Sequence, residues 1–314
     1  MKKTLCILAL ILAVALTGCR RQEAGPATPP EGPETPPETA PLAVEELRLE
    51  ILKTDQRSED LLAAVRVLPE RLRTALAERG VEAESVRLTV GASAAASVEA
   101  VESGGVDAAF LPADLLAAQE TTAAVTLVSG PADGDAVGRT ALLFAAPTEY
   151  CANLAGRPAP TWEELSRARW AVTEGTAAEW GAALWLADRC EGKTLADLPD
   201  LTEYSSEADL LSAAAAGEVD LFALDTAQSA QVAAVLPEAA VLRETERLYD
   251  GAVLAGTVDV RLTEALAGAV NALLEQDGED GQLLRAVLDA EADTRYRTAP
   301  AGALDAQRHL AALG

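Results

Sequence analysis

Two short stretches of the chain carry groups that could bind a ligand. Glu174-Gly175-Thr176-Ala177-Ala178 falls where a predicted strand passes into a predicted helix. Free N–H groups and the helix dipole suit such a turn to an anion, although Thr176 could equally be an ordinary N-cap. Asp225 ends another predicted strand, where open α/β sheets place ligands, or it caps the next helix. The sequence predicts a polar binding site and leaves both alternatives open.

Side chains for catalysis are scarce. His309 is the only histidine and falls in the last predicted helix, so serine–histidine and cysteine–histidine pairs lack their base. The sequence has neither a glycine-rich dinucleotide motif nor a P-loop. No cysteine pair or histidine cluster has the spacing of a metal site. We therefore expect no enzyme, no cofactor and no metal.

The N-terminal cysteines belong to an export signal. Met1-Lys2-Lys3 precedes an uninterrupted apolar run over residues 5–16, and Leu16-Thr17-Gly18-Cys19 follows. That ending resembles the lipobox of bacterial lipoproteins, whose cysteine is acylated and becomes the first residue of the mature protein. The run is shorter than the ~20 residues of a spanning helix, which disfavours a transmembrane anchor. We expect a signal peptide over residues 1–18 and a lipid on Cys19.

The other two cysteines are Cys151 and Cys190. In an exported protein they could form a disulfide. A loop of 39 positions would be closed, which stabilises a fold by about 3 kcal/mol in the chain-entropy model. The sequence does not give the distance between their Cα atoms. A disulfide and two free thiols therefore both stay open.

Charge and composition limit the kinds of partner that the protein can have. The 314 residues include 25 Lys and Arg against 50 Asp and Glu, a net charge of −25. Removing residues 1–18, which hold two lysines and no acid, leaves a net charge of −27. Such a field repels nucleic acid and anionic headgroups, so we expect no nucleic-acid partner and no membrane contact besides the lipid. Residues 20–45 are rich in proline and predict a disordered tether.

The elements that must position these residues alternate between strand and helix from about residue 46. Hydrophobic periodicity predicts strands at residues 47–52, 86–90, 106–111, 125–128, 140–145, 170–173, 201–204, 219–224, 239–242 and 253–255. It predicts helices at 61–80, 94–103, 161–165, 177–190, 207–216, 262–275, 281–290 and 303–313. This alternation indicates βαβ units, a mainly parallel sheet and two α/β lobes.

Several motifs over residues 46–300 resemble the periplasmic phosphate/phosphite/phosphonate-binding proteins of ABC importers. Residues 97–112, SVEAVESGGVDAAFLP, are similar to the family's VEAL-x-x-G-x-AD-x-AFL-x-P segment. Other matching pieces are Thr161–Leu165, Arg169–Val172, Ala183–Asp188 and Ala213–Asp220. The resemblance implies an α/β, two-lobe type 2 periplasmic-binding-protein fold with a hinge and a central ligand cleft.

The family fold also implies that the chain leaves its first lobe and later returns. Residues 46–138 and 246–314 would form lobe one, and residues 139–245 would form lobe two. The signal peptide at 1–18 and the lipidated, proline-rich tether at 19–45 precede them. Ligand in the cleft would close the lobes by a hinge motion.

The family's ligand turn usually reads Ser-Thr-Ser-Gly. The matching positions here are Thr176, Ala177, Ala178 and Glu179, so one hydroxyl remains and a carboxylate stands beside the turn. Backbone N–H groups could still hold an anion, but the carboxylate would work against a dianion.

Three further residues complete the expected site. Asp225 matches an acid that binds an amino group in aminophosphonate binders. Trp180 and Tyr204 either line the cleft or pack in the core, as most aromatic residues do.

The resemblance thus implies a monomeric, lipid-anchored, extracytoplasmic solute-binding protein on the bacterial cell membrane. It would capture a small polar, phosphonate-like solute and deliver it to an ABC permease. The alternative is a non-transport sensor or interaction lipoprotein on the same fold, with a degenerate cleft.

Overall fold

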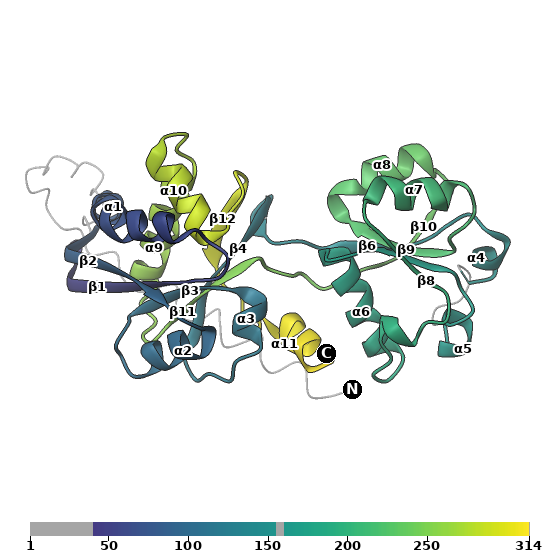
Figure 1. Ribbon diagram of the computed structural model, residues 1–314, viewed down its shortest axis with the longest axis horizontal. Helices are drawn as coiled ribbons and strands as arrows, with labels where there is room; N and C mark the ends of the chain where they lie inside the picture. Colours follow the sequence, from purple (N-terminus) through teal and green to yellow (C-terminus); the bar gives the residue numbers. More distant parts are fainter. Residues whose placement is uncertain (1–39, 155–159, 314) are drawn as a thin grey trace, which may run out of the picture. The chain divides into compact units, whose positions relative to one another are not determined.

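The computed structural model describes residues 40–154 and 160–313. The predicted signal peptide, Cys19 and most of the predicted tether lie outside these residues. Two β-sheets, each with helices on both faces, make up the described part (Figure 1). The predicted α/β class with two lobes is therefore confirmed. No helix in the two described ranges has the length and apolar character that a membrane span requires.

The first sheet has the strand order β12-β4-β11-β3-β1-β2, and β5 pairs with β4. β1 runs parallel to β2 and β3, whereas β4, β11 and β12 run antiparallel to their neighbours. The strands are β1 (Leu42–Leu52), β2 (Val81–Gly91), β3 (Ala108–Pro112), β4 (Ala124–Asp133), β5 (Ala136–Val137), β11 (Gly251–Ala255) and β12 (Thr294–Thr298).

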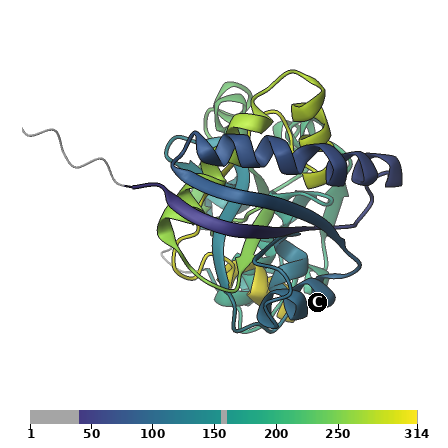
Figure 2. The same cartoon turned by 90° about the vertical axis from the view of Figure 1, so that its left-hand side faces the viewer.

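Both faces of the first sheet are covered because its strands are apolar on both sides. Leu47, Leu49 and Ile51 alternate along β1 and pack against α1 (Ser58–Ala77), α9 (Val260–Leu274) and α10 (Glu279–Leu288). Figure 2 shows α1, in dark blue, lying along this face. α2 (Ala94–Glu102) and α3 (Ala113–Ala117) cover the opposite face. The last helix is α11 (Asp305–Leu313).

The second sheet has the order β10-β6-β9-β7-β8. β7 runs parallel to β8 and β9, while β6 is antiparallel to β9 and β10. The strands are β6 (Ala141–Ala145), β7 (Trp170–Thr173), β8 (Leu201–Tyr204), β9 (Leu221–Asp225) and β10 (Ala240–Glu244).

Helices also cover both faces of the second sheet. One face carries α4 (Glu149–Leu154), α5 (Trp162–Leu165) and α6 (Ala177–Arg189), and the other carries α7 (Glu207–Ala215) and α8 (Ser229–Val235). Short 3-10 turns η1 (Leu195–Asp197) and η2 (Thr226–Gln228) follow α6 and β9. Thr161 caps α5 through a reciprocal capping box with Glu164.

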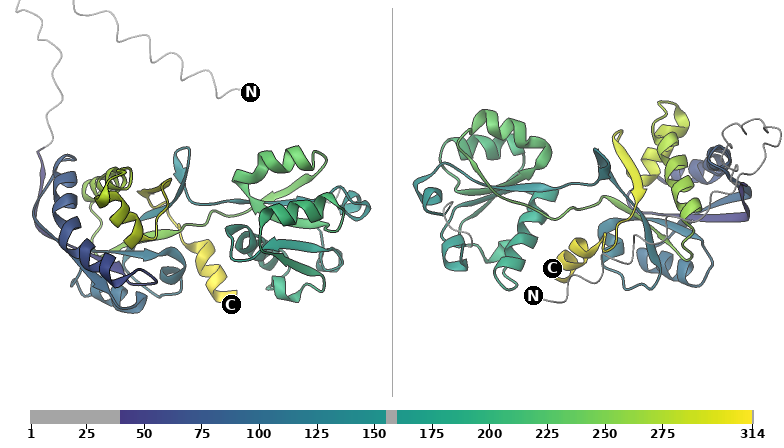
Figure 3. Two further views of the ribbon diagram at one scale, coloured as in Figure 1. Left: turned by 45° about the horizontal axis from the view of Figure 1, so that its top comes forward. Right: turned by 180° about the vertical axis from the view of Figure 1, so that it is seen from behind.

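Two crossover segments link the sheets, and both views of Figure 3 show them. Residues 134–140 run from β4 to β6, and residues 245–250 run from β10 to β11. They pair with each other where the Arg139 N–H donates to the Leu248 carbonyl (2.8 Å) and the Leu248 N–H donates to the Arg139 carbonyl (2.9 Å).

The prediction of a mainly parallel sheet is wrong, because both sheets are mixed. Alternation of strand and helix implies parallel pairing only when each strand returns to the same sheet. β4, β6, β10 and β11 instead flank the crossover segments and are antiparallel to their neighbours. β1 also begins earlier than expected, at Leu42, because it already pairs there with Val81 of β2.

One arrangement occurs in both sheets. β1-α1-β2-α2-β3 and β7-α6-β8-α7-β9 have the same order and the same parallel pairing, with the first strand in the middle. We call them the first and the second unit. In the first unit the Arg48 guanidinium donates to both oxygens of Asp107 (3.2 and 2.6 Å) and to the Gly104 carbonyl (2.8 Å).

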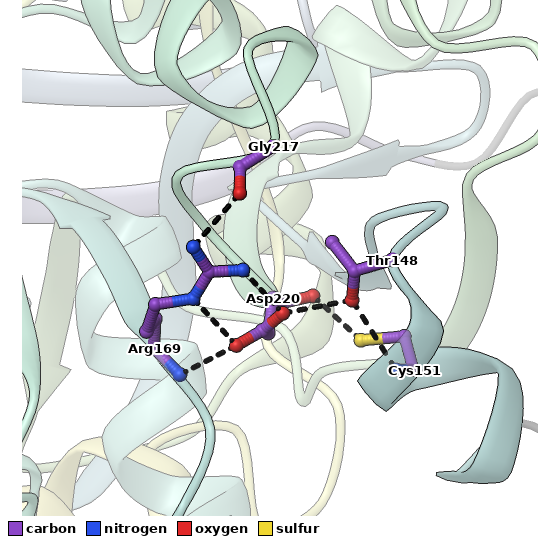
Figure 4. A network of polar contacts seen from close by, with 5 residues as sticks. All are labelled: Thr148, Cys151, Arg169, Gly217 and Asp220. Carbon is purple, nitrogen blue, oxygen red and sulfur yellow. Dashed lines mark hydrogen bonds and ion pairs between the residues drawn. The ribbon is translucent and has the colours of Figure 1, made fainter.

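The second unit repeats these contacts. The Arg169 guanidinium donates to both oxygens of Asp220 (2.9 and 2.8 Å) and to the Gly217 carbonyl (2.8 Å), as Figure 4 shows. In both units the backbone N–H of the arginine also donates to the aspartate. Each set of contacts, here called the clamp, fixes the turn after the second helix against the central strand of its unit.

Candidate functional site

The predicted anion turn lies between β7 and α6. Gly175 has a positive φ of 73°, which glycine adopts without strain, and this lets the chain reverse into the helix. Thr176 is the N-cap of α6: its hydroxyl accepts a hydrogen bond from the Glu179 N–H (3.3 Å) and donates to the Thr173 carbonyl (2.7 Å). The capping alternative therefore describes Thr176.

A carboxylate of the chain itself occupies part of this turn. The Gly175 N–H donates to Glu179 Oε2 at 2.7 Å. Among the described residues, only the backbone N–H groups of Ala177 and Ala178 are left without a partner in the first turn of α6. From the sequence we expected Glu179 beside the turn, but we did not predict its hydrogen bond with the Gly175 N–H.

Asp225 also caps a helical turn, as one of its two interpretations predicts. It is the last residue of β9, and its Oδ1 accepts a hydrogen bond from the Ala227 N–H at 2.8 Å. Its other carboxylate oxygen stays available, because the capping bond uses only Oδ1. A capping role and a place in a binding site are thus compatible.

A cavity of about 430 Å³ brings most of the predicted residues together. Thr176, Ala177, Ala178, Trp180 and Asp225 line it from the second unit. Tyr204 does not line it and packs against the core beneath α7 and α8. The remaining lining includes Arg139, Glu207, Leu248, Tyr249 and Asp250.

The cavity is predominantly acidic. Burial raises the pKa of the Glu207 carboxyl, and the nearby charge of Asp225 raises it further, while Arg139 acts in the opposite direction. Burial also raises the pKa of Asp250, although Arg139 Nε lies 3.4 Å from Asp250 Oδ1. Three carboxylates thus face one guanidinium.

Two aromatic side chains complete the wall. Trp180 lies in the first turn of α6 and leaves 43% of its surface exposed, which is unusual for so large an apolar side chain. Tyr249 belongs to the second crossover segment, and burial raises the pKa of its hydroxyl. Both line the same cavity.

A second hollow of about 350 Å³ lies at the carboxyl ends of β1 and β3 in the first sheet. It shares Arg139 and Asp250 with the cavity, and Ser129 and Tyr296 also line it. Burial raises the pKa of Tyr296 to about 12, partly offset by its hydrogen bond with Ser129. The Arg139–Asp250 pair therefore lines both this hollow and the cavity.

Sequence reasoning missed Arg139, Glu207, Tyr249 and Asp250. A sequence feature could have marked Arg139 as a candidate site residue, because it is the single basic residue between Arg87 and Arg157. The others sit at element ends in a chain rich in acids, and only the crossover geometry brings them together.

The remaining residues with reactive side chains lie outside the cavity. Cys151 and Cys190 are free, buried thiols, and burial raises the pKa of both. The Cys151 thiol donates to the Asp220 carbonyl at 3.0 Å. Nδ1 of His309 in α11 lies 3.3 Å from Oδ1 of Asp188 in α6. Within the described residues no cluster of His, Cys, Asp and Glu could hold a metal ion.

No protein-family profile and no curated protein matches the chain. Solved structures do match. A protein of Xanthomonas citri bound to ATP has 14% identity and a TM-score of 0.41, covering 86% of this chain and 96% of that one. PhnD1 from Prochlorococcus marinus in complex with methylphosphonate has 12% identity and a TM-score of 0.37, covering 85% and 97%.

The alkanesulfonate-binding protein SsuA from Xanthomonas axonopodis, bound to MOPS, has 19% identity and a TM-score of 0.35, covering 88% of this chain and 93% of that one. All three solved structures are only distantly similar to this chain, at 12–19% identity and TM-scores of 0.35–0.41. At these TM-scores the likeness identifies neither a ligand nor a site residue of this chain.

Proposed function

We propose that this chain is an extracytoplasmic solute-binding protein that captures a small polar solute and delivers it to an ABC permease. The cavity of about 430 Å³ carries the proposal. It combines residues at the carboxyl ends of β7 and β9 with Arg139 and Asp250 of the crossover segments. A hinge motion in those segments would move the two sets relative to each other, so a solute that contacts both would favour one arrangement.

In this proposal residues 46–138 and 246–314 form lobe one, and residues 139–245 form lobe two. Thr176, Ala177, Ala178, Trp180 and Asp225 contact the solute from lobe two. Tyr204 supports the core beneath them. Binding needs no covalent step, and we propose that the protein acts as a monomer.

We further propose that a lipid on Cys19 holds the protein at the cell membrane and that residues 19–45 act as a tether. The Cys19→Ala variant should then move from the membrane fraction to the soluble fraction. The test is a fractionation blot with Cys6→Ala as the matched control, since Cys6 lies within the expected signal peptide. Equal membrane retention of both variants would contradict a lipid on Cys19.

A sensor or interaction lipoprotein is the second candidate function. The observation in its favour is the turn before α6, where Glu179 and Thr176 already use the Gly175 and Glu179 N–H groups. A cleft that has lost its solute could retain such a self-capped turn. Genes for a permease and an ATPase beside this one would favour transport.

The direct test is thermal stabilisation of the mature chain carrying Cys19→Ser. The solutes are amines, amino acids, sugars, phosphate, phosphite and phosphonates. A solute at about 100 times its Kd adds about 2.7 kcal/mol of stability, a clear rise in Tm. A rise with a solute of any class supports a solute-binding protein, and no rise with any class favours the sensor.

A further inference from the structure

The cavity lining also bears on the kind of solute, an inference that rests on the proposed function. We infer that the solute carries a positive charge, as an amine or quaternary ammonium group, and that it is not an oxyanion such as a phosphonate. Three features of the cavity and of the turn beside it lead to this solute class.

The first feature is the turn before α6, where an anion would have to bind. Glu179 Oε2 already accepts the Gly175 N–H at 2.7 Å, and the Thr176 hydroxyl is engaged with Thr173 and Glu179. The carboxylate of Glu179 thus takes one N–H group of the turn, brings a negative charge to the helix N-terminus and leaves only the Ala177 and Ala178 N–H groups for an anion. A second anion there would meet this charge at close range.

The second feature is the charge of the wall. Glu207, Asp225 and Asp250 face a single cation, Arg139. Arg139 lies beside Asp250, whereas Glu207 and Asp225 have no ion-pair partner among the described residues. Repulsion between Glu207 and Asp225 is reduced when a cation enters between them.

The third feature is aromatic. Trp180 is 43% exposed although it lines a cavity, and Tyr249 belongs to the same lining. Exposed aromatic faces beside carboxylates attract ammonium groups, because the negative face of the ring and the carboxylate charge act together. The ring faces offer an anionic phosphonate no such attraction.

Calorimetric titration of the mature chain with Cys19→Ser tests the inference. The cationic probes are choline, ethanolamine and putrescine. The neutral probe is 3,3-dimethylbutanol, which has the shape of choline without its charge, and the anionic probes are methylphosphonate and ethanesulfonate. We expect at least one cation to bind ten-fold or more tightly than the neutral and anionic probes, with the affinity falling as NaCl rises.

A matched pair of variants locates the binding. Glu207 is the first residue of α7, and Glu218 follows the end of the same helix, at the opposite end of the sheet. Glu207→Gln should weaken binding of the cation about ten-fold, whereas Glu218→Gln, which removes the same charge, should leave it unchanged. Equal weakening in both variants would assign the attraction to net charge and refute the inference.

The other outcomes separate the two proposals. Binding of methylphosphonate or ethanesulfonate in preference to every cation refutes a cationic solute but leaves a solute-binding protein intact. Binding only of an uncharged sugar from the thermal panel has the same meaning. Failure of every probe and every panel solute refutes the proposed function itself.

Discussion

Replacing Arg169 by methionine should destabilise the protein far more than the same change at Arg48. The two arginines make the same set of hydrogen bonds to an aspartate and a glycine carbonyl in their respective clamps. The two clamps differ in the burial of the aspartate. The Asp220 side chain is 5% exposed, whereas that of Asp107 is 33% exposed. The pair of substitutions therefore compares two aspartates that have the same arginine contacts but differ in burial.

The magnitude follows from what Asp220 loses. Breaking a buried ion pair costs about 3–5 kcal/mol because one charge is left unpaired. Asp220 would keep hydrogen bonds from the Arg169 N–H and the Thr148 hydroxyl, and 40% of the Arg169 side chain is already exposed. We therefore expect Arg169→Met to lower the free energy of unfolding by about 2–3 kcal/mol. At Asp107 water can replace the lost bonds, so Arg48→Met should cost clearly less.

Urea unfolding followed by tryptophan fluorescence measures this loss. The four tryptophans lie in α5, β7 and α6, so their fluorescence reports on the second sheet and its helices. With a slope of about 2 kcal/mol per molar urea, the midpoint of Arg169→Met should fall by about 1–1.5 M. Circular dichroism reports on both units, so it measures the unfolding of Arg48→Met, whose substitution lies in the first unit. Equal shifts in the two variants would refute the dependence on burial.

The pH dependence gives a second check on the same variant. Burial raises the pKa of Asp220, but hydrogen bonds from Arg169 and Thr148 outweigh it, so the pKa lies below its ordinary value of 3.8. A carboxyl with a lowered pKa stabilises the folded protein above its unfolded pKa and loses that contribution as the pH falls through the folded pKa. The difference in the free energy of unfolding between wild type and Arg169→Met should have its full size at pH 7 and decrease below about pH 4.

Three further predictions concern the buried thiols, the cap of α6 and the buried pair Glu50 and Ser97. Cys151 and Cys190 should not react with a thiol reagent until the protein unfolds, because both thiols are buried with raised pKa values; fast reaction of the native protein would contradict this. Thr176→Ala should cost about 1 kcal/mol by loss of the α6 cap, with Thr176→Ser near wild type in urea unfolding. Glu50→Ala with Ser97→Leu should add about 1–3 kcal/mol, because each residue buries an oxygen without a described partner; a net loss would contradict it.

Much of the fold could be predicted because the core elements have strong periodicity. β7 and β8 match their predicted bounds, Trp170–Thr173 and Leu201–Tyr204. α1 spans Ser58–Ala77 through Pro69, because its apolar residues keep helical spacing on both sides of the proline. β12 was missed since Thr294–Thr298 reads as TRYRT, and its partner β4 lies far away in the sequence.

The candidate site was predicted only where local sequence determines it. The turn at Thr176 and the strand end at Asp225 are local features, and both line the cavity. Arg139 and Asp250 meet through the pairing of two crossover segments separated by more than a hundred positions. No local pattern encodes that contact, and the acidic composition conceals which carboxylates converge.

The two clamps explain why the sequence motifs indicate a fold more clearly than a ligand. The resemblance rested partly on segments that include Val106-Asp107 and Val219-Asp220, and these aspartates belong to the clamps, each immediately before its strand, β3 or β9. The cavity lies at the carboxyl ends of β7 and β9. Motif residues therefore secure one end of each unit and leave the other end free to differ.

The carboxyl ends do differ between the units. Counting from the clamp arginines, Glu50 of the first unit corresponds to Ala171 of the second, and both are buried. A Cβ atom on Gly91 would lie 2.6 Å from Glu50 Oε1 and 2.3 Å from the Ser97 hydroxyl, so only glycine fits over this polar pair. The second unit has a buried alanine, Ala171, at the position of Glu50, so the polar pair belongs to the first unit. The burial of this pair must therefore be offset by the apolar contacts around it, because neither oxygen has a partner among the described residues.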